Sequence, residues 1–250
     1  MLEEAILDAT RIYGPDHPEM GVLLAQLARA RSFESRHEEA VALLEQAEQL
    51  FLRAVGLDHP NTMAIMTGLG LELEDLGRHD EALARYQQAH EIARRIFPAD
   101  NLQAQVVAQN LANSLRRADR PGEALTLHQR IVEVRTARLG VADPETLEAR
   151  ENLADDLRAL GRHADAVAAY EAVIADRERD GGPEDPPVAY PLIGLALCQL
   201  ALGRAEEASA AAERAERLLT TGGEARYRAL AQHALAYVLR RRGELERASE

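Results

Sequence analysis

The stretch LGRHDEA, Leu76–Ala82, decides the fold because close relatives of it recur along the chain at a fixed interval. Its arginine and its alanine each return every 42 residues, as Arg36, Arg78, Arg120, Arg162 and Arg204 and as Ala40, Ala82, Ala124, Ala166 and Ala208. A constant period between about 20 and 50 residues is typical of an array of stacked repeats. The sequence therefore predicts one repeated structural unit.

The composition favours helices and argues against nucleic acid as a partner. Of the 250 residues, 46% are hydrophobic but only 4% are aromatic, and Trp is absent. Such a composition suits closely packed helices better than a β-sandwich, which prefers β-branched and aromatic residues. The formal net charge of −13 would repel a phosphate backbone.

Several features predict a soluble, cytoplasmic protein without a membrane partner. The single cysteine, Cys198, cannot form a disulfide within the chain, which fits a reducing compartment. The first residues carry acidic side chains where a signal peptide has basic ones. The most apolar run, residues 191–203, is too short to cross a bilayer.

Each unit is predicted to contain two helices. In the second unit we expect a first helix over Thr62–Leu76 and a second helix over Asp80–Phe97. The apolar residues fall on one stripe of each helix, with Ile65, Leu69, Leu73 and Leu76 in the first and Leu83, Tyr86, Ala89, Ala93 and Ile96 in the second. This pattern predicts an all-α array of antiparallel helix pairs.

Glycine, proline and aspartate mark the expected helix ends. Glycines that can adopt the left-handed conformation after a helix are Gly14, Gly56, Gly140 and Gly182 after second helices, and Gly77, Gly161 and Gly203 after first helices. First helices are expected to open at Pro18, Pro60, Pro144 and Pro186, with Asp143 and Asp185 as N-caps. In the third unit Leu102 replaces the proline, and Asp119 replaces the glycine of the corner. Aspartate tolerates the left-handed region better than most residues.

The predicted units form a single array over residues 1–250. Residues 1–16 form a partial leading helix, the repeats span 17–58, 59–100, 101–142, 143–184 and 185–223, and residues 224–250 form an incomplete sixth repeat. In this last piece we expect a first helix over 224–242, a corner at Gly243 and the start of a second helix. Repeat arrays usually end in a polar capping helix. We therefore hypothesise that the sequence is a segment of a longer protein.

The aligned units resemble tetratricopeptide repeats, in particular the 42-residue variety seen in kinesin light chains and many bacterial regulators. The resemblance rests on the acidic–alanine pairs such as Glu81-Ala82, on Asp58-His59-Pro60, and on the Asn-Leu-Ala strings that begin at Asn110 and Asn152. It implies a right-handed superhelical α-solenoid of stacked antiparallel helix pairs. It also implies a concave groove, lined by the first helices, that binds extended peptides or helices.

The same resemblance implies that Asn110 and Asn152 hold the backbone of a bound peptide. An asparagine side chain both donates and accepts hydrogen bonds, which suits a backbone of any sequence. The equivalent positions of the other units hold Gln26, Gly68 and Gly194, so a complete asparagine ladder is not expected.

No motif in the sequence predicts catalysis, a cofactor or a metal site. Histidines recur one or two positions before acidic residues, as His37, His79 and His163, and before prolines, as His17 and His59. Because the period spreads them along the array, we interpret them as corner and capping residues and not as groups that converge on one point. The sequence contains no HExxH, paired CxxC or P-loop motif. Cys198 lies on an apolar helix face and is expected to be a buried, unreactive thiol.

The candidate partner-binding residues lie on the predicted first helices of the third and fourth units. They are Gln109, Asn110, Asn113, Arg116 and Arg117 in the third unit, and Glu148, Glu151, Asn152, Asp155 and Arg158 in the fourth. The matching faces of the second and fifth units are largely apolar. We predict a non-catalytic interaction module that binds a peptide or protein segment there.

Two alternatives stay open. Arg116 and Arg117 could pair with Glu151, Asp155 or Asp156 of the next unit, as exposed ion pairs worth about 0–1 kcal/mol each and without any ligand. The chain could instead be an assembly or sensor segment of a larger signalling or transcriptional regulator. Such a segment would act through its open ends, by self-association.

Overall fold

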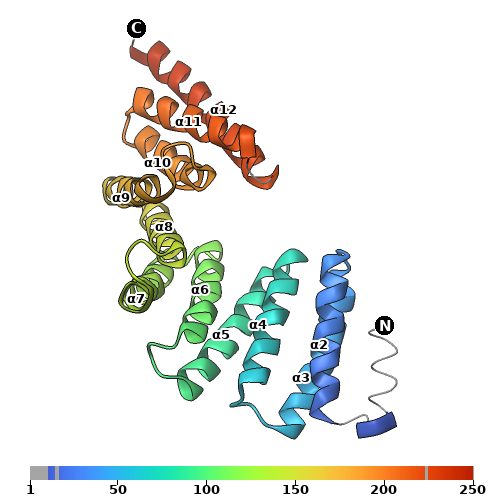
Figure 1. Cartoon of the computed structure of the whole chain (residues 1–250). Coiled ribbons are helices and arrows are strands. Elements are labelled where there is room, and N and C mark those ends of the chain that lie inside the picture. Colours follow the sequence, from blue (N-terminus) through green and yellow to red (C-terminus); the bar gives the residue numbers. More distant parts are fainter. Residues whose placement is uncertain (1–10, 15–16, 223–224, 250) are drawn as a thin grey trace. The chain divides into compact units, whose positions relative to one another are not determined.

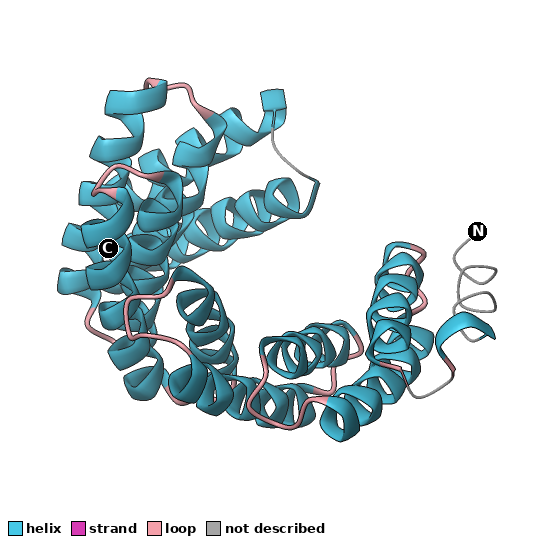
Figure 2. Cartoon of the chain, turned by 60° about the horizontal axis from the view of Figure 1, so that its bottom comes forward, coloured by secondary structure: helices cyan, strands magenta, loops and turns pink. Residues whose placement is uncertain are grey.

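The computed structural model describes residues 11–14, 17–222 and 225–249, and all regular elements in these ranges are helices (Figures 1 and 2). The prediction of an all-α fold is confirmed. The predicted leading helix over residues 1–16 lies mostly outside the described residues. The chain divides into two compact units, Met1–Arg120 and Pro121–Glu250, and each is described by itself. The single array over residues 1–250 stays a prediction.

From residue 17 on, the first unit contains two complete helix pairs and one further helix (Figure 1). Its helices are α2 (Pro18–Phe33), α3 (His37–Ala54), α4 (Pro60–Asp75), α5 (His79–Ile96) and α6 (Leu102–Arg117). Helix α2 packs on α3 and α4 packs on α5, while α3 with α4 and α5 with α6 join successive repeats. The observed bounds of α4 and α5 agree with the predicted ones to within two residues.

The second unit continues the pattern of consecutive packed helices. Its elements are α7 (Pro121–Leu139), α8 (Pro144–Ala159), α9 (His163–Gly181), the 3₁₀ helix η1 (Pro186–Val188), α10 (Ala189–Ala201), α11 (Ala205–Gly222) and α12 (Ala225–Ser249). In addition to its sequence neighbours, α10 contacts α8 and α12. An ion pair of 2.6 Å between Arg214 and Glu178 joins α11 to α9.

The LGRHDEA motif forms the corner between the two helices of a repeat. Gly77 has a φ of +73°, and Asp119 takes its place in the third repeat with a φ of +57°, as predicted. Arg78 directly precedes α5, and its guanidinium lies 2.6 Å from the carboxylate of Glu81. The same pairing, again at 2.6 Å, joins Arg36 to Glu39 and Arg162 to Asp165. The motif therefore recurs because it closes one helix and starts the next.

Small residues let the two helices of a repeat cross closely. Ala82 is fully buried in α5, and Tyr86, one turn further on, is 1% exposed. A Cβ atom at Gly70 of α4 would overlap the ring of Tyr86. The equivalent position holds Ala112, Ala154 and Ala196 in later repeats, and all three are fully buried.

Two of the predicted helix ends are wrong. Asp143 caps α8 by accepting a hydrogen bond of 2.9 Å from the Glu145 N–H, but Asp185 makes no such bond. The consecutive prolines that follow Asp185 lie in the 3₁₀ helix η1, so α10 begins later, at Ala189. Helix α12 runs through Gly243 without a corner. A glycine inside a helix costs only about 1 kcal/mol relative to alanine, so it does not by itself end the helix.

No helix among the described residues is both long and apolar enough to cross a membrane. The apolar run that covers much of α10 is a core segment instead. Leu192, Ala196 and Cys198 are each less than 5% exposed there.

Candidate functional site

The predicted site residues of the third repeat form one face of α6. Gln109, Asn110, Asn113 and Arg116 are half-buried, and Arg117 is exposed. Arg116 donates a hydrogen bond of 3.2 Å to Asn113 Oδ1. Arg117 forms an ion pair of 2.6 Å with Glu74 of α4, in the preceding repeat. Its predicted pairing with acidic residues of the fourth repeat involves the other unit and stays a prediction.

Asn110 differs from its neighbours on this face. Its carboxamide is partly exposed, and it has no side-chain hydrogen bond to any of the residues that the structure describes. The helix backbone at this position is fixed by packing, because Leu111 and Ala112 beside Asn110 are buried. The face therefore presents one polar group whose donor and acceptor are both available.

The predicted residues of the fourth repeat form one face of α8. Glu148 is exposed, and Glu151, Asn152, Asp155 and Arg158 are half-buried. Asp155 Oδ1 accepts hydrogen bonds from the hydroxyl of Tyr170, at 2.6 Å, and from Arg158 Nη2, at 3.3 Å. Burial raises the pKa of Tyr170, so its hydroxyl stays protonated and donates to Asp155. Asp155 is thus held in place by Tyr170 of α9, the second helix of its own repeat.

The position of Tyr170 also explains why the asparagine is missing from the fifth repeat. A Cβ atom at Gly194 of α10 would overlap the Tyr170 ring, so only glycine fits there. Gly68, at the same position in the second repeat, has Leu44 as its nearest neighbour at 3.5 Å. A side chain would therefore fit at Gly68 but not at Gly194.

Glu151 is the most perturbed carboxyl group of the predicted site. Its side chain is 20% exposed, and its Oε2 lies 3.1 Å from Arg177 Nη2 of α9. Burial raises the pKa of Glu151 to about 7, and the nearby guanidinium of Arg177 opposes this shift. The carboxyl group can therefore gain or lose a proton near neutral pH.

Four of the five histidines named in the sequence analysis have the structural roles that the sequence predicts. His17 Nδ1 accepts a hydrogen bond from the Glu19 N–H, at 3.2 Å, and His59 Nδ1 accepts one from the Asn61 N–H, at 3.1 Å. These two residues cap α2 and α4. His79 and His163 are the first residues of α5 and α9.

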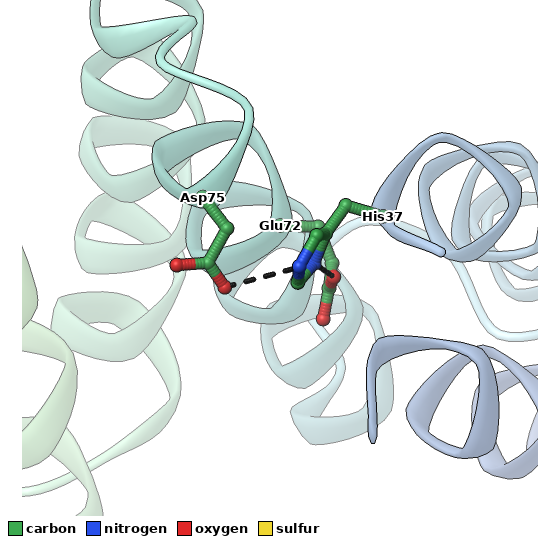
Figure 3. A group of neighbouring side chains, drawn as sticks. All are labelled: His37, Glu72 and Asp75. Carbon is green, nitrogen blue, oxygen red and sulfur yellow. Dashed lines mark hydrogen bonds and ion pairs between the residues drawn. The ribbon is translucent and has the colours of Figure 1, made fainter. Parts of the chain in front are cut away.

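His37 departs from the prediction that the histidines do not converge with other ligand-type groups. Its Nδ1 lies 2.9 Å from Glu72 Oε2 and 3.7 Å from Asp75 Oδ2 (Figure 3). Sequence reasoning missed this group because it searched for contacts at the 42-residue period. The two carboxylates lie 35 and 38 residues after the histidine.

The thiol of Cys198 is fully buried, as the sequence predicts. Burial raises its pKa to about 11. The thiolate is the reactive form of cysteine, so this residue is a packing residue at neutral pH.

Comparisons with solved structures agree with the observed fold. One similar structure contains kinesin light chain TPR-like repeats from Podosopora anserina, which are nearly identical to one another. It has a TM-score of 0.73 and 23% identity to this chain, and the match covers 83% of this chain and 99% of that chain. BtubC (BKLC) from P. vanneervenii has a TM-score of 0.72 and 20% identity, and the match covers 88% of this chain and 89% of that chain. YrrB, described as a TPR protein with an unusual peptide-binding site, has a TM-score of 0.58 and 20% identity, over 92% and 97%.

Sequence comparison assigns the family. No curated protein sequence matches the chain. The family of tetratricopeptide repeats matches residues 1–53, 34–95, 103–179 and 152–221, which together cover most of the chain. With the kinesin-light-chain-like repeats among its structural matches, the predicted subtype is supported as well. The chain belongs to the tetratricopeptide-repeat family.

Proposed function

We propose that the chain is a non-catalytic protein-interaction module that holds an extended peptide or protein segment against the first-helix faces of its repeats. Membership of the tetratricopeptide-repeat family supports protein binding in general. The peptide-binding site described for YrrB supports a peptide as one kind of partner. The observation that carries the proposal is the partly exposed carboxamide of Asn110, which has no partner in the described part of the chain.

The chemistry of Asn110 suits the backbone of a bound segment. A peptide group offers one N–H donor and one C=O acceptor, and a carboxamide can pair with both at once. The side chain projects from a helix whose opposite face is buried, so no backbone conformational entropy is lost at this position when it binds. Asn152 occupies the equivalent position of the fourth repeat and is the second residue that we propose to contact the bound segment.

The charges on the two faces predict what the bound segment carries. On the α8 face Glu151 is paired with Arg177 and Asp155 with Arg158. The three carboxylates Glu148, Glu151 and Asp155 still outnumber these two guanidinium groups, which favours lysine or arginine in the segment that crosses the face. The α6 face carries Arg116 and Arg117, which favour an acidic residue. On each face, complementary charge would select the side chains of the segment, while the asparagine would contribute affinity that does not depend on its sequence.

A random peptide library tests this proposal because it offers the chain many different candidate segments at once. The library is panned against the immobilised wild-type chain, and the selected peptides are tested on the Asn110→Ala/Asn152→Ala variant. The matched control is Gln87→Ala, which removes an exposed carboxamide from the second helix α5. We expect binding to the control to be unchanged and binding to the double variant to be lost. Equal binding to all three proteins, or no enrichment of any peptide, would refute the proposal.

A specific observation also supports self-association through α12. Ala231, Ala234 and Val238 are buried on one side of this helix, which packs on α10 and α11. Leu230 and Tyr237, two turns apart, lie beside this buried stripe and are 51% and 47% exposed. Light scattering of the wild-type chain and of a Leu230→Lys/Tyr237→Lys variant tests this second function. A wild-type chain that is monomeric at high concentration would exclude it.

A further inference from the structure

The side chains of His37, Glu72 and Asp75 converge between the first two repeats (Figure 3). His37 is the first residue of α3, and the two acidic residues lie three positions apart on α4. That spacing places them on the same side of the helix. One nitrogen or oxygen atom from each of the three side chains lies within 4.8 Å of the other two. All three residues belong to the first unit.

The local charge favours a cation. Neither Glu72 nor Asp75 forms an ion pair with an arginine or a lysine in the described part of the chain, and their only charged partner is His37. Glu72 is 8% exposed, and Glu38 adds a further negative charge near the imidazole. One imidazole therefore faces three carboxylates. A buried carboxylate is costly unless a cation or hydrogen-bond donors compensate it.

The three residue types occur together at only one repeat junction. The residues 35 and 38 positions after His79 are Ser114 and Arg117, and those after His163 are Cys198 and Ala201. The corner histidine thus recurs, but its two carboxylates do not. The helix junction does not require the carboxylates, because the same junction forms elsewhere in the chain without them.

We propose that His37, Glu72 and Asp75 bind a divalent transition-metal ion of the zinc type, which links α3 to α4. Zinc accepts imidazole nitrogen and carboxylate oxygen at about 2.0–2.2 Å, and three protein ligands leave one position for water. Neighbouring ligands around a tetrahedral ion at this distance are about 3.4 Å apart. The two nitrogen–oxygen distances, 2.9 and 3.7 Å, lie on either side of that value. The third pair of ligand atoms, the two carboxylate oxygens, lies within 4.8 Å, and rotation of the exposed Asp75 side chain would complete the site.

The consequence would be a metal-dependent junction between the first two repeats. Helix α3 is the second helix of one repeat and α4 is the first helix of the next, and they pack directly on each other. An ion held by both helices would restrict their relative movement. Because it binds the folded state, it would also raise the thermal unfolding midpoint. The inference does not depend on the proposed peptide-binding function.

Titration calorimetry with ZnCl₂ on the tag-free, EDTA-treated full chain tests this inference. We expect one equivalent of Zn²⁺ to bind the wild-type chain and raise its unfolding midpoint. His37→Ala should lower the affinity at least about tenfold. His79→Ala is the matched control, because it removes the same corner histidine from a junction without the carboxylates, and it should bind as the wild type does. Bound Co²⁺ should show the visible absorption of a tetrahedral site in the wild type and the control.

Two carboxylate variants identify the ligands separately. Glu72→Gln removes the buried ligand, and Asp75→Asn removes one whose side chain is 59% exposed and can be changed without disturbing the core. Each should weaken Zn²⁺ binding while the far-UV circular dichroism stays that of the wild type. If the wild type shows no saturable binding, or if His37→Ala binds Zn²⁺ as tightly as His79→Ala, the three residues form only an ion-pair cluster and the inference is wrong.

Discussion

Arg117 Nη1 lies 2.6 Å from Glu74 Oε2, so an ion pair joins α6 to α4, the first helices of two consecutive repeats. Part of the predicted partner-binding face is therefore already paired within the protein. Asn110, on the same helix, is not paired to any described residue. On the α6 face, Arg117 thus belongs to the part that joins two repeats, and Asn110 belongs to the part that is available to a ligand.

This ion pair is expected to contribute little to stability. The side chain of Arg117 is 56% exposed, so water screens its attraction to Glu74. A double-mutant cycle with Arg117→Ala and Glu74→Gln, measured by urea unfolding, should give a coupling free energy of about 0–1 kcal/mol. A coupling well above this range would show that the pair is a structural requirement, which would remove Arg117 from the ligand-binding face.

The glycines at equivalent positions of two repeats should respond in opposite ways to the same substitution. Gly68→Ala adds a methyl group next to Leu44, 3.5 Å away, and replaces a glycine inside a helix. It should leave the free energy of unfolding unchanged or raise it by up to about 1 kcal/mol. Gly194→Ala would place the methyl group against the ring of Tyr170 and should lower the free energy of unfolding by about 1–3 kcal/mol. Equal thermal midpoints for the two variants would contradict the placement of Tyr170.

Glu151 should make stability depend on pH. Its pKa is about 7 in the folded chain and near the ordinary 4.5 when unfolded, so the folded state holds the proton more tightly. The contribution of Glu151 to stability is therefore complete below about pH 4.5 and is lost as the pH rises to about 7. The loss should be no more than about 3 kcal/mol, because the side chain is partly solvated and faces Arg177.

Urea unfolding at several pH values checks this dependence. Glu151→Gln cannot ionise, so the stability of the wild type relative to this variant should fall between about pH 5 and pH 7.5. Glu148→Gln removes an exposed carboxylate from the same face and serves as the control. A difference between wild type and Glu151→Gln that stays constant or rises with pH would contradict the assigned pKa.

The features that depend on a single repeat could be predicted from the sequence. The 42-residue period predicted the corners because Gly77 and its equivalents each end a helix, which depends only on the local backbone conformation. Asp119 was predicted to replace glycine for the same local reason, and it does. The predictions at Asp185 and Gly243 were wrong because neither a proline nor a glycine fixes a helix boundary without its packing neighbours.

The features that depend on contacts between helices could not be predicted in the same way. The ten candidate residues all have partly or fully exposed side chains, as their helical spacing indicates. Some of their partners, such as Tyr170 for Asp155, come from neighbouring helices, and the sequence separation of these pairs is not the 42-residue period. His37 illustrates the signal that was missed. A comparison of residues 35 and 38 positions downstream of each corner histidine would have singled out Glu72 and Asp75.

The affinity of a library-selected peptide for the Asn110→Ala variant tests the central claim most directly. If Asn110 holds the peptide backbone through two hydrogen bonds, the Kd measured by titration calorimetry should rise about tenfold or more, while Gln87→Ala leaves it unchanged. A Kd that is the same for Asn110→Ala and the wild type would contradict the account and place the bound peptide elsewhere on the chain.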